Sequence, residues 1–235
     1  MAKISIMATG DSFITQRLPR LDERVQSIRE LLGQVDARFT NLEVTIHEFG
    51  VYPSAVSGGT WAAARPPVLS DLSWLGFNML AWANNHTLDW SHHGLLETHL
   101  HLEKEGFIHA GVGHNLAEAS QPRYLETRNG RIALIGVNST LRDWHPAGEQ
   151  RRDVLGRPGV NPLRFETVHR LSIQDFHALQ AIIAKTDVNA VRLLSEQEGF
   201  SRAREGMFHV DHLQFETGEP GTITRMTRKD AERIG

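Results

Sequence analysis

The sequence predicts an α/β domain in which helices flank layered sheets. Short apolar runs alternate with helical patterns over the first 137 residues, an order typical of α/β folds. An Asn-Gly pair between two apolar runs adds a strong hairpin signal. Because 40% of the 235 residues are apolar, the chain can bury a sizeable core.

The N-terminal region predicts two strands and a helix. The apolar run at residues 3–8 leads into Thr9-Gly10-Asp11, so we expect a buried strand that delivers the Asp11 carboxylate into a loop. Apolar residues then recur at helical spacing until Gly33 ends the pattern. A second strand at residues 37–44 ends among polar residues, in the segment Asn41-Leu42-Glu43.

The middle of the chain predicts two helices on either side of a strand. Helical patterns cover residues 68–75 and 94–105. The apolar run at 78–83 lies between them and stops abruptly at Asn84-Asn85-His86. This third strand therefore also ends in polar side chains.

A hairpin and an irregular segment follow. Strand patterns at residues 124–128 and 131–137 flank Asn129-Gly130, which predicts a two-residue hairpin turn. Residues 142–164 are rich in Arg, Pro and Gly. We expect them to form an exposed excursion, because an unpaired buried charge costs several kcal/mol.

The C-terminal region predicts further helices. Ser172 and Asp175 resemble a capping box that opens a helix reaching to about residue 185, and a short helix is expected at 188–197. A last helical pattern over 227–234 has only begun when the sequence stops. We therefore expect this sequence to be the front part of a longer protein.

These elements suggest three regions. Residues 1–141 are predicted to form the α/β core, and residues 142–164 are the excursion. Residues 165–235 are expected to be a helical and mixed insertion, or the start of a second half.

Composition restricts the function. The net charge of −3 is scattered and gives no footprint for nucleic acid. The absence of cysteine excludes disulfides, thiolate zinc sites and cysteine nucleophiles. No stretch is long and apolar enough to enter a membrane, and no secretory signal is recognisable. We expect a soluble, cytoplasmic protein, and a homo-oligomer remains open.

Three polar clusters follow the three N-terminal strands. They contain Asp11, residues 41–43, and residues 84–86 with Asp89 close behind. In an open α/β sheet such strand ends share one edge, where ligands bind, so the clusters are expected to converge. Together the carboxylates, amides and imidazole could hold a divalent cation, or form an acid–base site without metal.

Each cluster also has a plainer interpretation. Gly10-Asp11 after a strand is most often a turn, and Glu43 can serve as a helix-capping carboxylate. Asn84-Asn85-His86 is harder to explain, because two amides and an imidazole after a buried strand gain nothing from packing. Four other histidines are expected at the solvated surface, namely His92, His93, His99 and His101.

The same clusters carry a family resemblance. Gly10-Asp11, Asn41-Leu42-Glu43 and the run from Leu80 to Trp90 occur in order, followed by blocks at 111–119 and 131–136. This series resembles the bacterial capsule-synthesis (CapA, poly-γ-glutamate) family, a branch of the calcineurin-like metallophosphoesterase fold. The resemblance covers residues 1–138 and fades afterwards.

The resemblance implies a calcineurin-like sandwich of sheets flanked by helices, here incomplete. Asp11, Glu43 and Asn85 would be the metal ligands, with Mn, Fe or Zn as the metal if one is bound. The catalytic residues would be His86 and Asp11, with Asp89 accepting the second ring proton of His86 and fixing its tautomer. Substrate-binding roles are predicted for three further residues: Asn41, Asn84 and Trp90.

Two departures from the family pattern weaken the metal prediction. Ser12 and Phe13 follow Asp11 where metallophosphatases carry an Asp-x-His pair, and Glu43 replaces an Asp. A later histidine block of the family has no convincing copy. The pair His209 and His212 alternates with apolar residues and is predicted to belong to an exposed strand.

Three functions remain open. The first is a hydrolase-type enzyme acting on a peptide or polyglutamate-type substrate by acid–base chemistry at His86, with or without a metal. The second is a metal-independent peptide epimerase, an isomerase that inverts an α-carbon. The third is a non-catalytic assembly factor in capsule or peptide export.

Overall fold

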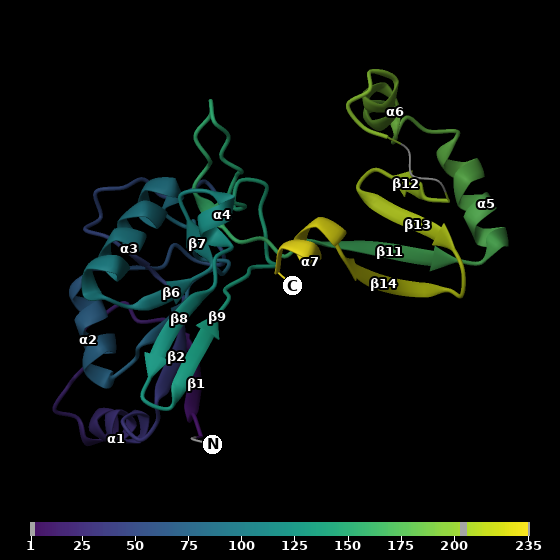
Figure 1. Ribbon diagram of the computed structural model, residues 1–235. Helices are drawn as coiled ribbons and strands as arrows, with labels where there is room; N and C mark the ends of the chain where they lie inside the picture. Colours follow the sequence, from purple (N-terminus) through teal and green to yellow (C-terminus); the bar gives the residue numbers. More distant parts are fainter. Residues whose placement is uncertain (1–2, 203–205, 235) are drawn as a thin grey trace. The chain divides into compact units, whose positions relative to one another are not determined.

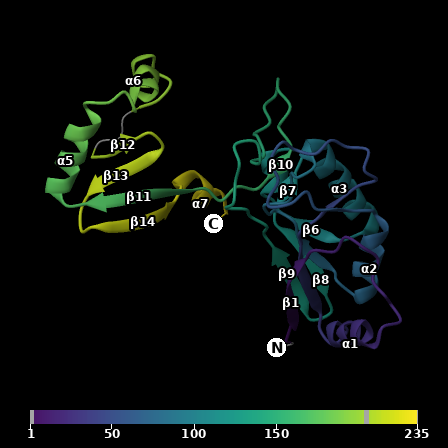
Figure 2. The same cartoon turned by 180° about the vertical axis from the view of Figure 1, so that it is seen from behind.

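A computed structural model describes residues 3–202 and 206–234. The chain divides into two compact units, which we call unit 1 (Met1–Leu163 with Glu232–Gly235) and unit 2 (Arg164–Ala231). Figures 1 and 2 show the elements of each unit from opposite sides. Both units combine helices with sheets, so the predicted α/β class is confirmed.

The central sheet of unit 1 contains four parallel strands. Their order is β1 (Ile6–Ser12), β2 (Ala37–Leu42), β5 (Met79–Ala81) and β6 (Ile108–Ala110). The register aligns Asp11 with Asn41, and Asn41 with Ala81. Because all four strands run the same way, their carboxyl ends form one edge, and the polar clusters follow there.

Helices α1 (Glu23–Leu32), α2 (Pro67–Leu75) and α3 (Ser91–Glu105) lie along the same side of this sheet (Figure 1). The ends of α2 follow from its sequence, since Pro67 suits a first helical position and Gly76 closes the helix at φ 103°. The core between helices and strands is apolar and buried, and its fully buried side chains include Trp82, Leu69, Leu80, Leu95 and Leu102.

Smaller elements complete unit 1. Two parallel strands, β3 (Thr45–Ile46) and β4 (Ala63–Ala64), pair beside the sheet edge. β7 (Val112–Gly113) pairs with β10 (Gly159–Val160), and α4 (Leu116–Ala119) follows β7. The predicted hairpin is present as β8 (Arg123–Thr127) and β9 (Gly130–Leu134).

Unit 2 contains a mixed sheet with the order β12-β13-β11-β14. Its strands are β11 (Phe165–Leu171), β12 (Phe208–Val210), β13 (Leu213–Thr217) and β14 (Gly221–Met226). The predicted C-terminal helices are present as α5 (Ile173–Ile183), α6 (Ala190–Gln197) and α7 (Arg228–Ile234). The Ser172 hydroxyl caps α5 by accepting from the Asp175 amide at 3.2 Å.

The expectation of a buried first strand is wrong. β1 runs to Ser12, so Asp11 lies within the strand, and Ile6 is 58% exposed. The reason is position, because β1 is an edge strand that pairs with β2 among the described strands. The first helix is also largely exposed, and Leu32 is its buried residue.

The excursion at residues 142–164 is mostly irregular, as expected, but it is not simply exposed. It contains the two-residue strand β10 and no buried strand pair within the described chain. His145, Ala147, Val160 and Asn161 are nevertheless buried, because β10 returns to pair with β7. None of the helices in the described part of the chain has the length and apolar character needed to span a bilayer.

A buried carboxylate fixes the segment between β1 and α1 onto α2. Asp71 has no exposed surface and accepts hydrogen bonds from Arg17 Nε (2.6 Å), the Leu18 amide (3.0 Å) and Arg20 Nε (2.8 Å). Burial by itself would raise the pKa of Asp71, but these donors outweigh it and lower the pKa to about 2.

Replacing Asp71 by Ala should lower the free energy of unfolding at pH 7 by about 2–4 kcal/mol, because the Leu18 amide and two arginines lose a buried acceptor. The folded-state pKa lies below the unfolded value near 3.9, so the contribution is complete above pH ~5 and is lost as pH falls towards 2. Urea unfolding at pH 7 and pH 3 measures both effects.

The matched control is Asp153→Ala, since Asp153 is exposed and lies 3.9 Å from Arg151. This control should change stability by less than about 0.5 kcal/mol. Equal effects of the two substitutions at pH 7 would contradict the anchoring role of Asp71.

Candidate functional site

A chain of side-chain hydrogen bonds joins the ends of three parallel strands. Asn84 Nδ2 donates to Asn41 Oδ1 at 3.1 Å, and Asn41 Nδ2 donates to Asp11 Oδ1 at 2.8 Å. Asn84 Nδ2 also donates to the Leu42 carbonyl at 2.8 Å. The clusters after β1, β2 and β5 therefore lie together at the carboxyl edge of the sheet.

An irregularity in β1 sets the position of Asp11. The register with β2 shifts between Ala8 and Asp11, so that three steps along β1 oppose two along β2. Thr40 Oγ1 donates to the Gly10 carbonyl at 2.9 Å within this bulge. Such bulges redirect side chains at sheet edges, and this one brings Asp11 opposite Asn41.

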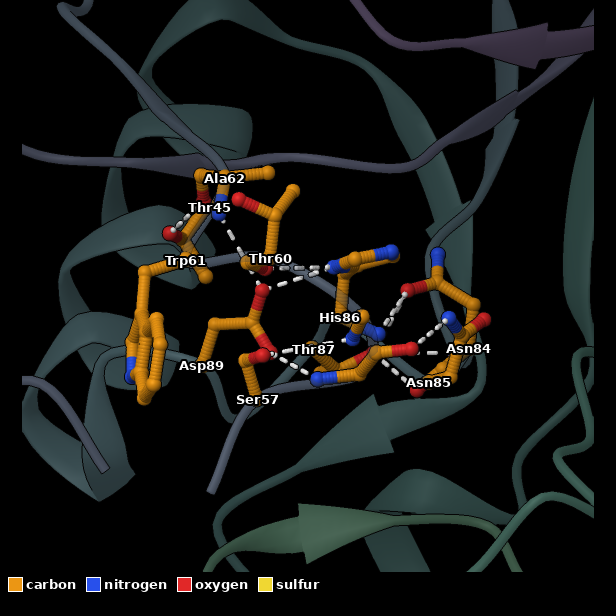
Figure 3. A network of polar contacts seen from close by, with 12 residues as sticks. Thr45, Ser57, Thr60, Trp61, Ala62, Asn84, Asn85, His86, Thr87 and Asp89 are labelled. Atoms are coloured by element: carbon orange, nitrogen blue, oxygen red, sulfur yellow. Dashed lines mark hydrogen bonds and ion pairs between the residues drawn. The ribbon is translucent and has the colours of Figure 1, made fainter. Parts of the chain in front are cut away.

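His86 is held in a tight turn after β5. Its amide donates to Asn84 Oδ1 at 3.0 Å, while its ring Nδ1 lies 2.7 Å from Asp89 Oδ2 and 3.2 Å from the Thr60 carbonyl (Figure 3). Because both ring partners are acceptors, Nδ1 carries the proton. Nε2 makes no hydrogen bond within the described residues, so its lone pair is free to accept a proton.

Asp89 connects this histidine to the segment at residues 54–62, which we call the strap. Asp89 is 1% exposed and accepts from the Gly58 amide at 2.7 Å and the Ala62 amide at 3.2 Å. The Ser54 amide in turn donates to the Asp89 carbonyl at 2.8 Å. One buried carboxylate thus holds both the strap and the His86 ring (Figure 3).

Glycine is required at one position of the strap. A Cβ added to Gly58 would lie 2.3 Å from the carbonyl oxygen of Asn85, closer than real Cβ contacts allow. Asn85 Nδ2 also donates to the Gly58 carbonyl at 3.0 Å. The backbone of the strap is therefore in direct contact with the turn that carries His86.

Two carboxylates lie beside the histidine. Burial raises the pKa of Glu43, and the neighbouring Asp11 raises it further against the opposing effect of His86. A cation between the carboxylates would relieve this crowding. Asp11 and Glu43 therefore offer two neighbouring carboxylates to a divalent ion, whereas the Asn85 side chain donates to the Gly58 carbonyl of the strap.

Other candidates make different contacts from those expected. The side chain of His86 is only 9% exposed, so its ring is nearly buried. The Asn84 side chain donates from Nδ2 to Asn41 and accepts at Oδ1 from the His86 amide, and these internal hydrogen bonds support a structural role. Trp90 packs on His47 and Phe49, with ring centroids 4.8 and 5.9 Å away.

Sequence reasoning missed the strap. Thr60 and Ala62 contact His86 and Asp89 through backbone atoms, which leave no signature in side-chain type. The Gly58-Gly59 pair was a usable signal, because adjacent glycines often mark a close backbone approach. The pair His209 and His212 was predicted to lie in one exposed strand, but His209 is half-buried in β12 and His212 lies in the turn before β13, where its Nδ1 contacts Asp211 at 2.7 Å.

A cavity of ≈ 390 Å³ lies near the end of β1. It is lined by Thr15, Gln16, Arg17, Phe49, Arg65, Pro67 and Val68. His86 is not in the lining, although Phe13, two residues before Thr15, packs edge-on against the His86 ring at 5.8 Å. The cavity is therefore a neighbour of the His86 turn and is distinct from it.

The fold and the polar edge define an α/β protein with a candidate acid–base site. The chain belongs to the bacterial capsule synthesis protein family PGA_cap, whose family model matches residues 5–196. The family predicted from the sequence is therefore confirmed. Two uncharacterized proteins of Sinorhizobium fredii (strain NBRC 101917 / NGR234), y4sH and y4uA, are each 38% identical to it over 170 residues. That alignment covers 69% of this chain but only 36% of either relative.

Asp89→Asn should lower the free energy of unfolding by about 2–4 kcal/mol and loosen the strap, because an amide presents a donor to backbone N–H groups that need acceptors. Limited proteolysis within residues 54–62 should accelerate in the variant, and urea unfolding gives the energy. Asp143→Asn is the matched control, because Asp143 is exposed. Equal proteolysis of both variants would show that Asp89 does not hold the strap.

Proposed function

We propose that this protein is an acid–base enzyme with a calcineurin-like fold, in which His86 transfers the proton. This proposal rests mainly on the fixed tautomer of the His86 ring. Asp89 and the Thr60 carbonyl hold the proton on Nδ1, so Nε2 has a lone pair ready to act as a base. Once protonated, the same nitrogen can serve as an acid, with Asp89 stabilising the charged ring.

The residues around His86 supply the remaining roles. Asp11 lies at the strand edge, oriented by Asn41, and can accept or orient a substrate proton. A metal ion held by Asp11 and Glu43 would polarise a carbonyl or phosphoryl oxygen. The strap lies against the ring, and the low exposure of His86 keeps bulk water from Nδ1.

The family suggests the substrate class. Capsule synthesis and the name PGA point to an amide-linked, carboxylate-rich polymer, so we propose a peptide or polyglutamate-type chain as substrate. Arg17 and Arg65 line the neighbouring cavity but are paired with Asp71 and Glu48, so the substrate proposal rests on the family. Cytoplasmic location and homo-oligomer formation remain predictions from the sequence.

Purified protein should be tested on poly-γ-glutamate and γ-glutamyl peptides, with Mn²⁺, Fe²⁺ or Zn²⁺ added or chelated. We expect His86→Gln to lower turnover by about 100-fold or more, the usual scale for a general acid–base group. Gln is preferred to Ala, because the ring is nearly buried and Ala would leave a cavity beside Asp89. His93→Gln is the control, since His93 is an exposed residue of α3.

The products distinguish the alternatives. Shortened chains indicate hydrolysis, whereas intact chains that take up deuterium from D₂O at an α-carbon indicate the epimerase. Wild-type protein that does neither would favour the assembly factor. Full activity in correctly folded His86→Gln would contradict the proposal.

A further inference from the structure

A second polar cluster lies away from His86, between α3, β7 and α4. It consists of His99 on α3, His114 directly after β7, and Glu118 on α4. One ligand atom from each residue lies within 4.8 Å of the other two. Among the described residues this is the group of His, Asp and Glu side chains whose ligand atoms are close enough to share an ion. α4 and β7 are adjacent in Figure 1.

His99 is the member that needs an explanation. It was expected at the solvated surface, and this prediction is wrong, because its side chain is only 9% exposed. Neither ring nitrogen makes a hydrogen bond within the described residues, and Nδ1 is fully buried without a partner. A metal ion on Nε2 would leave Nδ1 as it is, so the case for an ion rests on the position of Nε2.

The neighbouring rings keep His99 in place. His109 and His114 pack edge-on against it, with ring centroids 5.1 and 5.0 Å away. His109 Nε2 is itself occupied by Glu103 at 2.9 Å. The other ring nitrogen of His99, Nε2, faces Glu118 and lies 3.4 Å from its Oε1.

Helix capping accounts for part of this cluster. The Asn115 side chain accepts from the Glu118 amide at 2.9 Å, and Glu118 Oε2 accepts from the His114 amide at 3.0 Å. This arrangement explains why Glu118 turns back towards residue 114. It does not explain why a buried histidine from another helix directs Nε2 at the same carboxylate.

The distances match a metal polyhedron. Ligands at the usual zinc distances of about 2.0–2.1 Å are separated by about 3.3 Å along the edges of a tetrahedron. His99 Nε2 lies 3.4 Å from Glu118 Oε1, and His114 Nδ1 lies 3.2 Å from the same oxygen. Both spacings are close to a tetrahedron edge. The one to His114 is also a hydrogen-bond distance, since Nδ1 lies 3.0 Å from Glu118 Oε2, so zinc would replace the proton on that nitrogen.

We propose that His99 Nε2, His114 Nδ1 and a Glu118 carboxylate oxygen bind one Zn²⁺ ion. Two imidazoles and a carboxylate are a typical three-residue zinc set, with a fourth position for water. The side chain of His114 is 57% exposed, so solvent reaches this position. The ion would join α3 to the turn between β7 and α4, in a place separate from the carboxylates beside His86.

Zinc binding to the whole chelator-treated protein tests the proposal. We expect one tightly bound Zn²⁺ at this site, a rise in melting temperature when zinc is added, and a tetrahedral visible spectrum with Co²⁺. His114→Gln should weaken this binding by roughly 100-fold or more. It should leave the fold intact, because the His114 side chain is largely exposed. His101→Gln on α3 is the matched control and should bind like wild type.

Glu43→Gln separates this site from the one beside His86. If zinc and the tetrahedral Co²⁺ spectrum survive in Glu43→Gln but are lost in His114→Gln, the proposal is supported, whatever the activity of the enzyme. Loss in Glu43→Gln with retention in His114→Gln would overturn it. Folded wild-type protein that binds no zinc at roughly 100 µM would also overturn it.

Discussion

The buried carboxylate of Asp89 is the constraint on which the site depends. An ionised group with 1% exposure must be satisfied by donors, and here two backbone amides and one imidazole supply them. The amides come from the strap and the imidazole from the adjacent turn. The same carboxylate therefore holds the nine-residue strap in place and fixes the proton of the His86 ring on Nδ1. One residue thus determines both the local fold and the tautomer of the histidine.

The polar edge was largely predictable from the sequence. Asp11, Asn41 and Asn84 each follow or end a short apolar run, and parallel strands bring such ends together. The Asp89 contact with His86 was also predictable, because three residues separate them in one turn. Helix ends with explicit signals, such as Ser172 before α5 and Gly76 after α2, were likewise readable.

The rest depended on information that side-chain patterns do not carry. An apolar run cannot reveal whether its strand is central or at an edge, so the exposure of Ile6 was missed. The strap acts through backbone amides and carbonyls, which every residue possesses. His99 is covered by side chains distant in sequence, His109 on β6, His114 after β7 and Glu118 on α4. The position of His99 in the helical pattern, taken alone, predicted a solvated residue.

The close approach of Gly58 to Asn85 has a consequence for mutations outside the ionisable residues. A single base change that gives this glycine a side chain would push the strap away from the turn, although residue 58 has no ionisable group. Substitutions that disturb the site therefore include positions without an ionisable side chain. If the chemistry proposed for His86 is correct, a variant that keeps every acid and base can still lose its activity.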